Sequence, residues 1–307
     1  MKILFMGTPD IAAVSLKQLI KDGFDVVGVV TQPDKPRGRK QILTPPETKL
    51  AAQEAGIPVY QPEKLKNGEL KEVLEMLSPD LIAVVAYGKI LPDYVLDYPK
   101  YGCINMHGSL LPKYRGAAPI QWAVINGDRI TGVTTMKMDK GVDTGDMLLK
   151  KEIEIGKYET SEQLFERMAQ LGADVLSETI SHIKEITPVP QDNNAATHAP
   201  MITKEMAQID WNKSAEGISK LICGMNSWPI AYTLYNGQTM KIYSAVVSDE
   251  VYTGENGEIK ESEGKLVVKC ATGGIEIKEL QFAGSKRLSA AEYLRGHKMD
   301  RGTVLGK

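Results

Sequence analysis

Cysteine is scarce in this chain of 307 residues, which has only Cys103, Cys223 and Cys270. Because they are odd in number, far apart and outside any CxxC pair, they argue against a disulfide framework and a cysteine-bound zinc ion. Long apolar runs are also lacking, and none approaches the roughly 20 residues that span a bilayer. Neither charge dominates, since 37 Lys and Arg oppose 39 Asp and Glu. These absences predict a soluble protein of a reducing compartment, with no membrane partner.

Two nucleotide-binding fingerprints are missing as well. Gly7-Thr8-Pro9 follows the first apolar run, where a dinucleotide-binding fold carries GxGxxG, and the phosphate-binding pattern GxxxxGK[ST] occurs nowhere. A nicotinamide or flavin enzyme and ATP-driven chemistry are therefore disfavoured. Residues 2–7 already have the pattern of a buried strand, which leaves no room for a signal or transit peptide. We expect a cytoplasmic protein.

Short apolar runs alternate with helical spacing in the first part of the chain. The continuous runs cover residues 3–6, 26–30 and 81–86. They are typical of strands covered on both faces, whereas residues 9–21 have apolar side chains at helical spacing, and Thr160 with Gln163 indicates the start of a long helix. The order strand, helix, strand predicts an α/β domain with a Rossmann-like open sheet, whose ligands bind beyond the carboxyl ends of the strands.

The pattern changes near residue 190. Thr187-Pro188-Val189-Pro190 and the polar residues after it show no periodicity, which is typical of a linker. Strand-like runs separated by turn signals follow at residues 231–235, 241–247, 265–270 and 274–282. We predict an α/β domain at 1–189, a linker at 190–206 and a small β-barrel domain resembling an OB-fold at 207–307.

Two clusters of basic residues stand out against the balanced charge. Four of the six residues from Lys35 to Lys40 are cations, and because Pro36 and Gly38 interrupt them we expect a loop. The second cluster consists of Lys286, Arg287, Arg295, Lys298 and Arg301. Either cluster alone is typical of a solvated surface, but the two together suit the binding of one polyanion from two sides.

The densest group of chemically capable residues begins with Asn105 and His107. The apolar Ile104 before them indicates a strand, on which residues two apart share a face. An amide beside an imidazole is suited to hold a carbonyl oxygen as it becomes an oxyanion, and the imidazole also moves protons. A single histidine is more often structural, but the neighbouring amide, the following Gly108 and the strand-end position make the two interpretations about equal.

A second group follows another strand-like run. Residues 138–146, with the sequence MDKGVDTGD, place three carboxylates among glycines. The spacing does not fit an EF-hand loop and no histidine lies nearby in the sequence, so a metal site is disfavoured. Such a segment is often only a turn. A catalytic role requires one of these acids to reach His107, which spacing alone does not establish.

These residues resemble the formyltetrahydrofolate-dependent formyltransferases. Asn105-x-His107, the run Ser109-Leu110-Leu111-Pro112 and Asp143 in GVDTGD match the catalytic site of that family. MGTP at the start, the basic stretch after TQPD, IDW at 209–211 and NSWP at 226–229 resemble the branch of the family that acts on an aminoacyl-tRNA. Ser227 stands where the family often has proline. The resemblance covers essentially the whole chain.

The resemblance implies a donor and an acceptor. The first domain would bind 10-formyltetrahydrofolate along Ser109, Leu110, Leu111 and Pro112, and the second would help to hold methionyl-initiator tRNA. The implied reaction, formyl transfer to the methionine amine, would serve translation initiation and would require no metal. We expect the protein to act as a monomer.

It also implies roles for individual side chains. Asn105 and a protonated His107 would stabilise the tetrahedral oxyanion, while Asp143 would set the state of His107 and help to remove the amine proton. In the family the basic loop enters the acceptor stem, and the candidates for that contact are Arg37, Arg39 and Lys40.

Other functions share the same catalytic triplet. A formyltransferase for glycinamide ribonucleotide should end near the first domain, one for sugar nucleotides should carry a different second domain, and a hydrolase would use water as the acceptor. A nucleic-acid-binding module on an inactive α/β scaffold is an alternative of another class. It predicts no folate dependence and no effect of His107→Asn.

Overall fold

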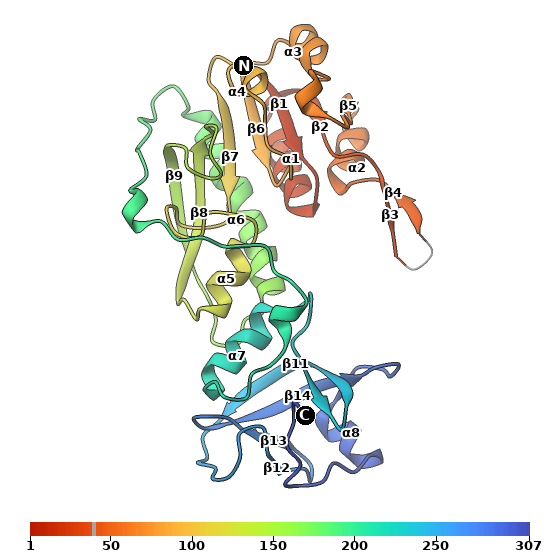
Figure 1. Cartoon of the computed structure of the whole chain (residues 1–307). Helices are drawn as coiled ribbons and strands as arrows, with labels where there is room; N and C mark the ends of the chain where they lie inside the picture. Colours follow the sequence, from red (N-terminus) through yellow and green to blue (C-terminus); the bar gives the residue numbers. More distant parts are fainter. Residues whose placement is uncertain (39–40) are drawn as a thin grey trace. The chain divides into compact units, whose positions relative to one another are not determined.

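The computed structural model describes residues 1–38 and 41–307, which divide into two compact units (Figure 1). The first unit comprises residues 1–116, 131–153 and 166–199. The second unit comprises residues 117–130, 154–165 and 200–307. The chain therefore passes between the units several times. The domain bounds given above stay predictions.

An open sheet forms the centre of the first unit. Its strands are β1 (Lys2–Gly7), β2 (Asp25–Val30), β5 (Val59–Tyr60), β6 (Leu81–Val85), β7 (Cys103–His107), β8 (Ile130–Lys137) and β9 (Met147–Glu154). They are arranged in the order β5–β2–β1–β6–β7–β8–β9, parallel from β5 to β7, with β8 antiparallel to β7. This arrangement confirms the Rossmann-like α/β class.

Helices pack on both faces of this sheet, as the continuous apolar runs predict. They are α1 (Asp10–Lys21), α2 (Glu47–Glu54), α3 (Lys71–Leu77), α4 (Asp93–Leu96) and α6 (Ser161–Ser181). Leu4 and Met6 of β1 pack in one core with Leu74 of α3 and Val95 of α4, while α1 contacts β1, β2 and β6. Because strand side chains alternate between faces, both sides of β1 are covered.

The basic stretch from Lys35 differs from its prediction. β3 (Lys35–Arg37) pairs antiparallel with β4 (Ile42–Thr44), and the hairpin extends away from the sheet of its unit (Figure 1). Gly38, with φ of +72°, adopts the left-handed conformation directly after β3. The prediction of a loop is wrong for Lys35–Arg37, because proline and glycine are compatible with the open edges and the turn of a two-stranded hairpin.

The second unit contains an antiparallel sheet in the order β10–β11–β14–β13–β12, with β15 added to β14. Its strands are β10 (Tyr232–Tyr235), β11 (Gln238–Ser248), β12 (Ile259–Glu261), β13 (Leu266–Lys269), β14 (Gly274–Phe282) and β15 (Leu288–Ser289). Its helices are α5 (Pro119–Ile125), α7 (Ala215–Gly224) and α8 (Ala290–Gly296). The small antiparallel β domain is confirmed.

In the described part of the chain, no helix has the length and apolar character needed to cross a bilayer.

The three cysteines are buried free thiols. Burial is the main cause that raises the pKa of Cys103 and that of Cys270 to about 12, and it also raises the pKa of Cys223. Because the thiolate is the nucleophile, both the raised pKa and the burial keep these thiols unreactive at pH 8. We expect iodoacetamide to leave the native protein unlabelled at pH 8 and to add three labels after unfolding, as measured by mass spectrometry. Rapid labelling of the native protein would contradict this burial.

Candidate active site

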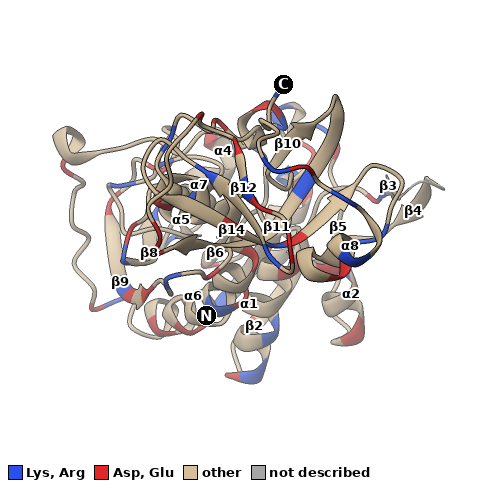
Figure 2. Ribbon diagram, turned by 90° about the horizontal axis from the view of Figure 1, so that it is seen from below, with Lys and Arg blue, Asp and Glu red and all other residues tan. Residues whose placement is uncertain are grey.

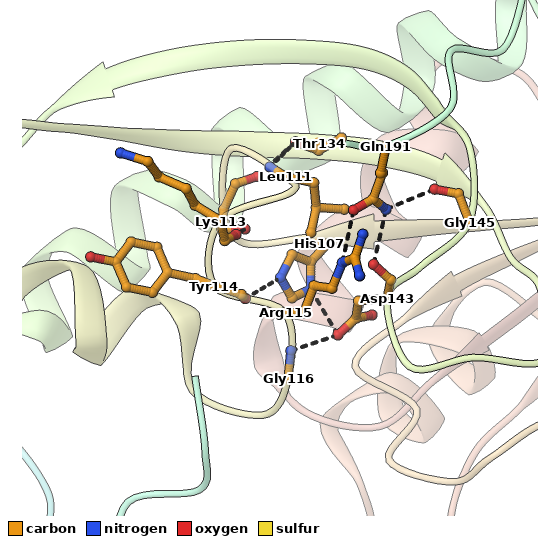
Figure 3. Close-up of polar contacts among 11 residues, drawn as sticks. His107, Leu111, Lys113, Tyr114, Arg115, Gly116, Thr134, Asp143, Gly145 and Gln191 are labelled. Carbon is orange, nitrogen blue, oxygen red and sulfur yellow. Dashed lines mark hydrogen bonds and ion pairs between the residues drawn. The ribbon is translucent and has the colours of Figure 1, made fainter. Parts of the chain in front are cut away.

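His107 is the last residue of β7, and its ring is held from two sides (Figure 3). Nε2 lies 2.9 Å from the carbonyl oxygen of Tyr114, and Nδ1 lies 3.6 Å from Oδ2 of Asp143. Because a carbonyl only accepts, Nε2 carries a hydrogen and donates it. Nδ1 therefore faces the carboxylate, at a distance too long for a strong hydrogen bond. The imidazole is 6% exposed, so its orientation is fixed by these neighbours.

The fold selects Asp143 from the three acids of residues 138–146. Asp139 accepts hydrogen bonds from within its own turn, and the side chain of Asp146 is exposed. Asp143 instead points toward His107, and its Oδ2 accepts a hydrogen bond of 2.9 Å from the backbone N–H of Gly116 (Figure 3). A catalytic role for one of the three acids required that it reach His107, and Asp143 does so.

Asn105 lies two residues before His107 on β7 and is half-buried. Met106 between them packs against Gly172 of α6. Because side chains alternate along a strand, Asn105 and His107 point to the face of the sheet opposite α6. Among the described residues, the Asn105 amide has no hydrogen-bond partner. It stands near the carboxyl end of a parallel strand, where open α/β sheets bind ligands, so its N–H groups are available to an oxygen atom there.

Residues 109–112 form the loop that directly follows His107. The Thr134 hydroxyl donates to the carbonyl of Ser109 at 2.7 Å and accepts from the N–H of Leu111 at 3.1 Å. Thr134 is itself the partner of His107 in the pairing of β7 with β8. One side chain therefore fixes the loop beside the imidazole. The sequence did not point to Thr134, because cross-strand pairing brings it to the site.

Of the three residues expected to contact tRNA, the structure describes one. Arg37 is the last residue of β3. Arg39 and Lys40 lie outside the described residues. Their contribution to an RNA-binding surface stays a prediction.

The carboxyl-terminal basic cluster lies in the second unit and is partly neutralised. The Arg287 guanidinium lies 4.3 Å from the centre of the Tyr243 ring and forms an ion pair with Glu279. Lys298 forms an ion pair with Asp300. Figure 2 shows Lys and Arg interspersed with Asp and Glu. Shared binding of one polyanion by the two clusters stays a prediction.

Gln191 contacts the segment that carries Asp143 and is itself bound by Arg115. The Gln191 amide donates to the backbone carbonyls of Asp143 and Gly145, and Arg115 donates to the Gln191 oxygen (Figure 3). No sequence pattern pointed to a role for Gln191 or Arg115, and Gln191 falls in the predicted linker. Within the described residues, no group of three or more His, Cys, Asp or Glu side chains is arranged to hold a metal ion.

Family models match both parts of the chain. Residues 1–180 match the model described as "Formyl transferase", and residues 201–298 match "Formyl transferase, C-terminal domain". The chain is 50% identical to the methionyl-tRNA formyltransferase of Ruminiclostridium cellulolyticum and 49% identical to that of Acetivibrio thermocellus. Each of these two alignments covers 100% of both proteins.

Solved structures share the fold at low sequence identity. An N-formyltransferase of Helicobacter canadensis, in complex with folinic acid and dTDP-3-aminofucose, has a TM-score of 0.70 and 19% identity, over 94% of this chain and 100% of that one. HypX of Aquifex aeolicus, in complex with tetrahydrofolic acid, has a TM-score of 0.62 and 17% identity, over 99% of this chain and 50% of that one.

Proposed function

The chain belongs to the formyl transferase family, and we propose that it transfers the formyl group of 10-formyltetrahydrofolate to the α-amine of methionyl-initiator tRNA. The observation that carries the proposal is the contact between His107 and Asp143 at the carboxyl end of β7. It occurs in a chain whose sequence is 50% identical, over its full length, to that of a methionyl-tRNA formyltransferase. We further propose that it works as a monomer in the cytoplasm, where its product starts translation.

The reaction exchanges one C–N bond for another. The neutral methionine amine attacks the formyl carbon, whose C=O becomes an oxyanion in a tetrahedral intermediate. The bond from this carbon to N10 of the folate then breaks, N10 takes up a proton, and the amine nitrogen loses one. The products are formylmethionyl-tRNA and tetrahydrofolate. Because the donor is already activated, the protein has to orient the reactants, stabilise the oxyanion and move protons.

The three side chains suit these tasks. The amide of Asn105 and the Nδ1–H of a protonated His107 donate to the oxyanion, while Nε2 keeps the ring fixed on the carbonyl of Tyr114. Asp143 stabilises the imidazolium through its carboxylate and takes the amine proton, directly or through water. Residues 109–112, fixed by Thr134, lie beside His107 and line the folate site.

We expect replacement of Arg37 and Arg39 by Ala to weaken tRNA binding. Each phosphate contact that is lost should lower the slope of log K against log salt by up to about one. The measurement is a titration of methionyl-initiator tRNA at several salt concentrations. The matched control replaces the exposed Lys17 and Lys21 of α1 by Ala, which removes the same charge elsewhere. An unchanged slope in the Arg37/Arg39 variant would remove the hairpin from the RNA interface.

Single-turnover transfer tests the proposed function. Labelled formyl is supplied on 10-formyltetrahydrofolate, and the acceptors are methionyl-initiator tRNA, free methionine, glycinamide ribonucleotide, an amino-sugar nucleotide and water. We expect label on the aminoacyl-tRNA alone. Label on another acceptor would be consistent with the catalytic triplet but would show that methionyl-initiator tRNA is not the substrate. If no formyl group is transferred and folate has no effect, the inactive nucleic-acid-binding scaffold would be favoured.

A further inference from the structure

Arg115 is a buried cation next to the active site, 6% exposed. Its Nε donates to Oε1 of Gln191, and its Nη2 donates to Oδ1 of Asn193, each at 2.9 Å. Both acceptors are side-chain amides of the segment predicted to be a linker. Because a buried charge is costly unless its N–H groups are hydrogen-bonded, these contacts hold Gln191 and Asn193 against Arg115 within the first unit.

Gln191 joins this cation to the segment that carries Asp143. Its Nε2 donates to the carbonyl of Asp143 at 2.9 Å and to the carbonyl of Gly145 at 2.7 Å (Figure 3). Arg115 only donates and the carbonyls only accept, so a single orientation of the Gln191 amide satisfies all three contacts. The guanidinium therefore fixes which way the amide donates.

Asp143 has a backbone conformation that needs such support. Its φ is +54°, in the left-handed region that residues other than glycine rarely adopt. Conformations of this kind persist where surrounding contacts impose them, and they occur preferentially at functional sites. Here Gln191 holds the carbonyl of Asp143, and the N–H of Gly116 holds its carboxylate. The carboxylate then lies 3.6 Å from Nδ1 of His107.

We propose that Gln191, oriented by Arg115, is a positioning residue that holds Asp143 in this conformation and so sets its carboxylate against His107. The inference rests on the proposed function for its effect on turnover. It concerns the alignment of a catalytic group and leaves substrate binding to other residues. Because small displacements of reacting groups cost large factors in rate, we expect loss of the Gln191 contacts to lower kcat by about 10–100-fold. KM for both substrates should stay within about twofold, since ground-state binding is not involved.

Two substitutions separate the contacts of Gln191. Gln191→Met keeps the length of the side chain and removes every hydrogen bond. Gln191→Glu keeps an acceptor for Arg115 but supplies no donor for the two carbonyls. We expect both to lower kcat, because the donors are the groups that hold Asp143. The matched control is Gln170→Met, since Gln170 is exposed on the outer face of α6 and its amide donates to the exposed Asp174 of the same helix.

The position of the carboxylate is measured separately from activity. Hydrogen exchange of the Gly116 amide, followed by NMR, reports its bond to Asp143, and we expect it to become about tenfold faster in both Gln191 variants and to be unchanged in the control. Thermal unfolding is recorded so that kcat is compared below the melting temperature of every variant. A wild-type kcat in Gln191→Glu, or unchanged exchange at Gly116 in Gln191→Met, overturns the proposal.

The two proposals fail in different ways. If the wild-type protein transfers no formyl group to methionyl-tRNA, the proposed function is wrong, and the exchange of Gly116 still shows whether Gln191 holds Asp143. If the wild-type protein is active and both Gln191 variants match it in kcat, the function stands and the positioning role is wrong.

Discussion

His107→Asn is expected to lower the single-turnover rate of formyl transfer by roughly 10²–10⁴-fold, the usual contribution of a group that moves a proton in the transition state. Asn retains one hydrogen-bond donor near the formyl oxygen but carries no charge and cannot titrate. The affinity for methionyl-initiator tRNA should be nearly unchanged, because the imidazole is buried and held by Tyr114 and Asp143. The rate is measured by quenched flow and the affinity by filter binding.

The control for this variant is His182→Asn. His182 is exposed after the end of α6, where its Nδ1 lies 3.0 Å from the carbonyl of Glu178. This substitution should leave both the rate and the affinity unchanged. If His107→Asn weakens tRNA binding as much as it slows transfer, His107 belongs to the RNA-binding surface and has no catalytic role.

Gly145→Ala is expected to destabilise the protein by about 1–3 kcal/mol and to slow formyl transfer by roughly 10²-fold. A Cβ atom at Gly145 would overlap the carbonyl oxygen of Lys137, which is backbone and cannot move aside independently of β8. The turn would have to move, and the carbonyl of Gly145 would leave the Gln191 amide. The displacement would reach Asp143, two residues earlier. Denaturant unfolding and single-turnover kinetics measure the two effects.

Gly296→Ala is the matched control, because a Cβ atom at Gly296 meets nothing within 4 Å and its backbone is outside the left-handed region. We expect a change in unfolding free energy within about 0.5 kcal/mol and an unchanged rate. If Gly145→Ala slows formyl transfer but leaves the unfolding free energy unchanged, the turn can move without destabilising the protein. Loss of stability at full rate would separate this turn from catalysis.

Much of the fold follows from the sequence because its signals are local. Continuous apolar runs mark β1, β2 and β6, since both faces of each strand are covered. Thr160 and Gln163 mark the start of α6, where the N–H of each bonds to the side chain of the other. The β3–β4 hairpin was not predicted, because its residues are mostly polar or exposed and so carry no burial pattern.

The site was predictable in part for the same reason. Asn105 and His107 are two residues apart on one strand, so their proximity follows from strand geometry alone. Which of the three acids reaches His107 could not be predicted from the sequence. It depends on the path of the turn and on the hydrogen bond from the Gly116 N–H to Asp143. Gln191 could not be found, since it stands in a polar segment without periodicity and acts on a carbonyl 48 residues away.

Because residues 188–199 belong to the first unit, they also limit where such a protein can be joined to a different second unit. Consider a chimera that takes this chain up to residue 189 and another protein from there on. Gln191 and Asn193 would then be replaced, and Arg115 would lose both of its acceptors. A chimera joined after residue 199 would keep both acceptors of Arg115 and also its backbone hydrogen bonds with Thr197 and Ala199. A junction after residue 199 therefore keeps the contacts that hold Asp143, whereas residues 117–130 and 154–165, which precede it in the chain, belong to the second unit.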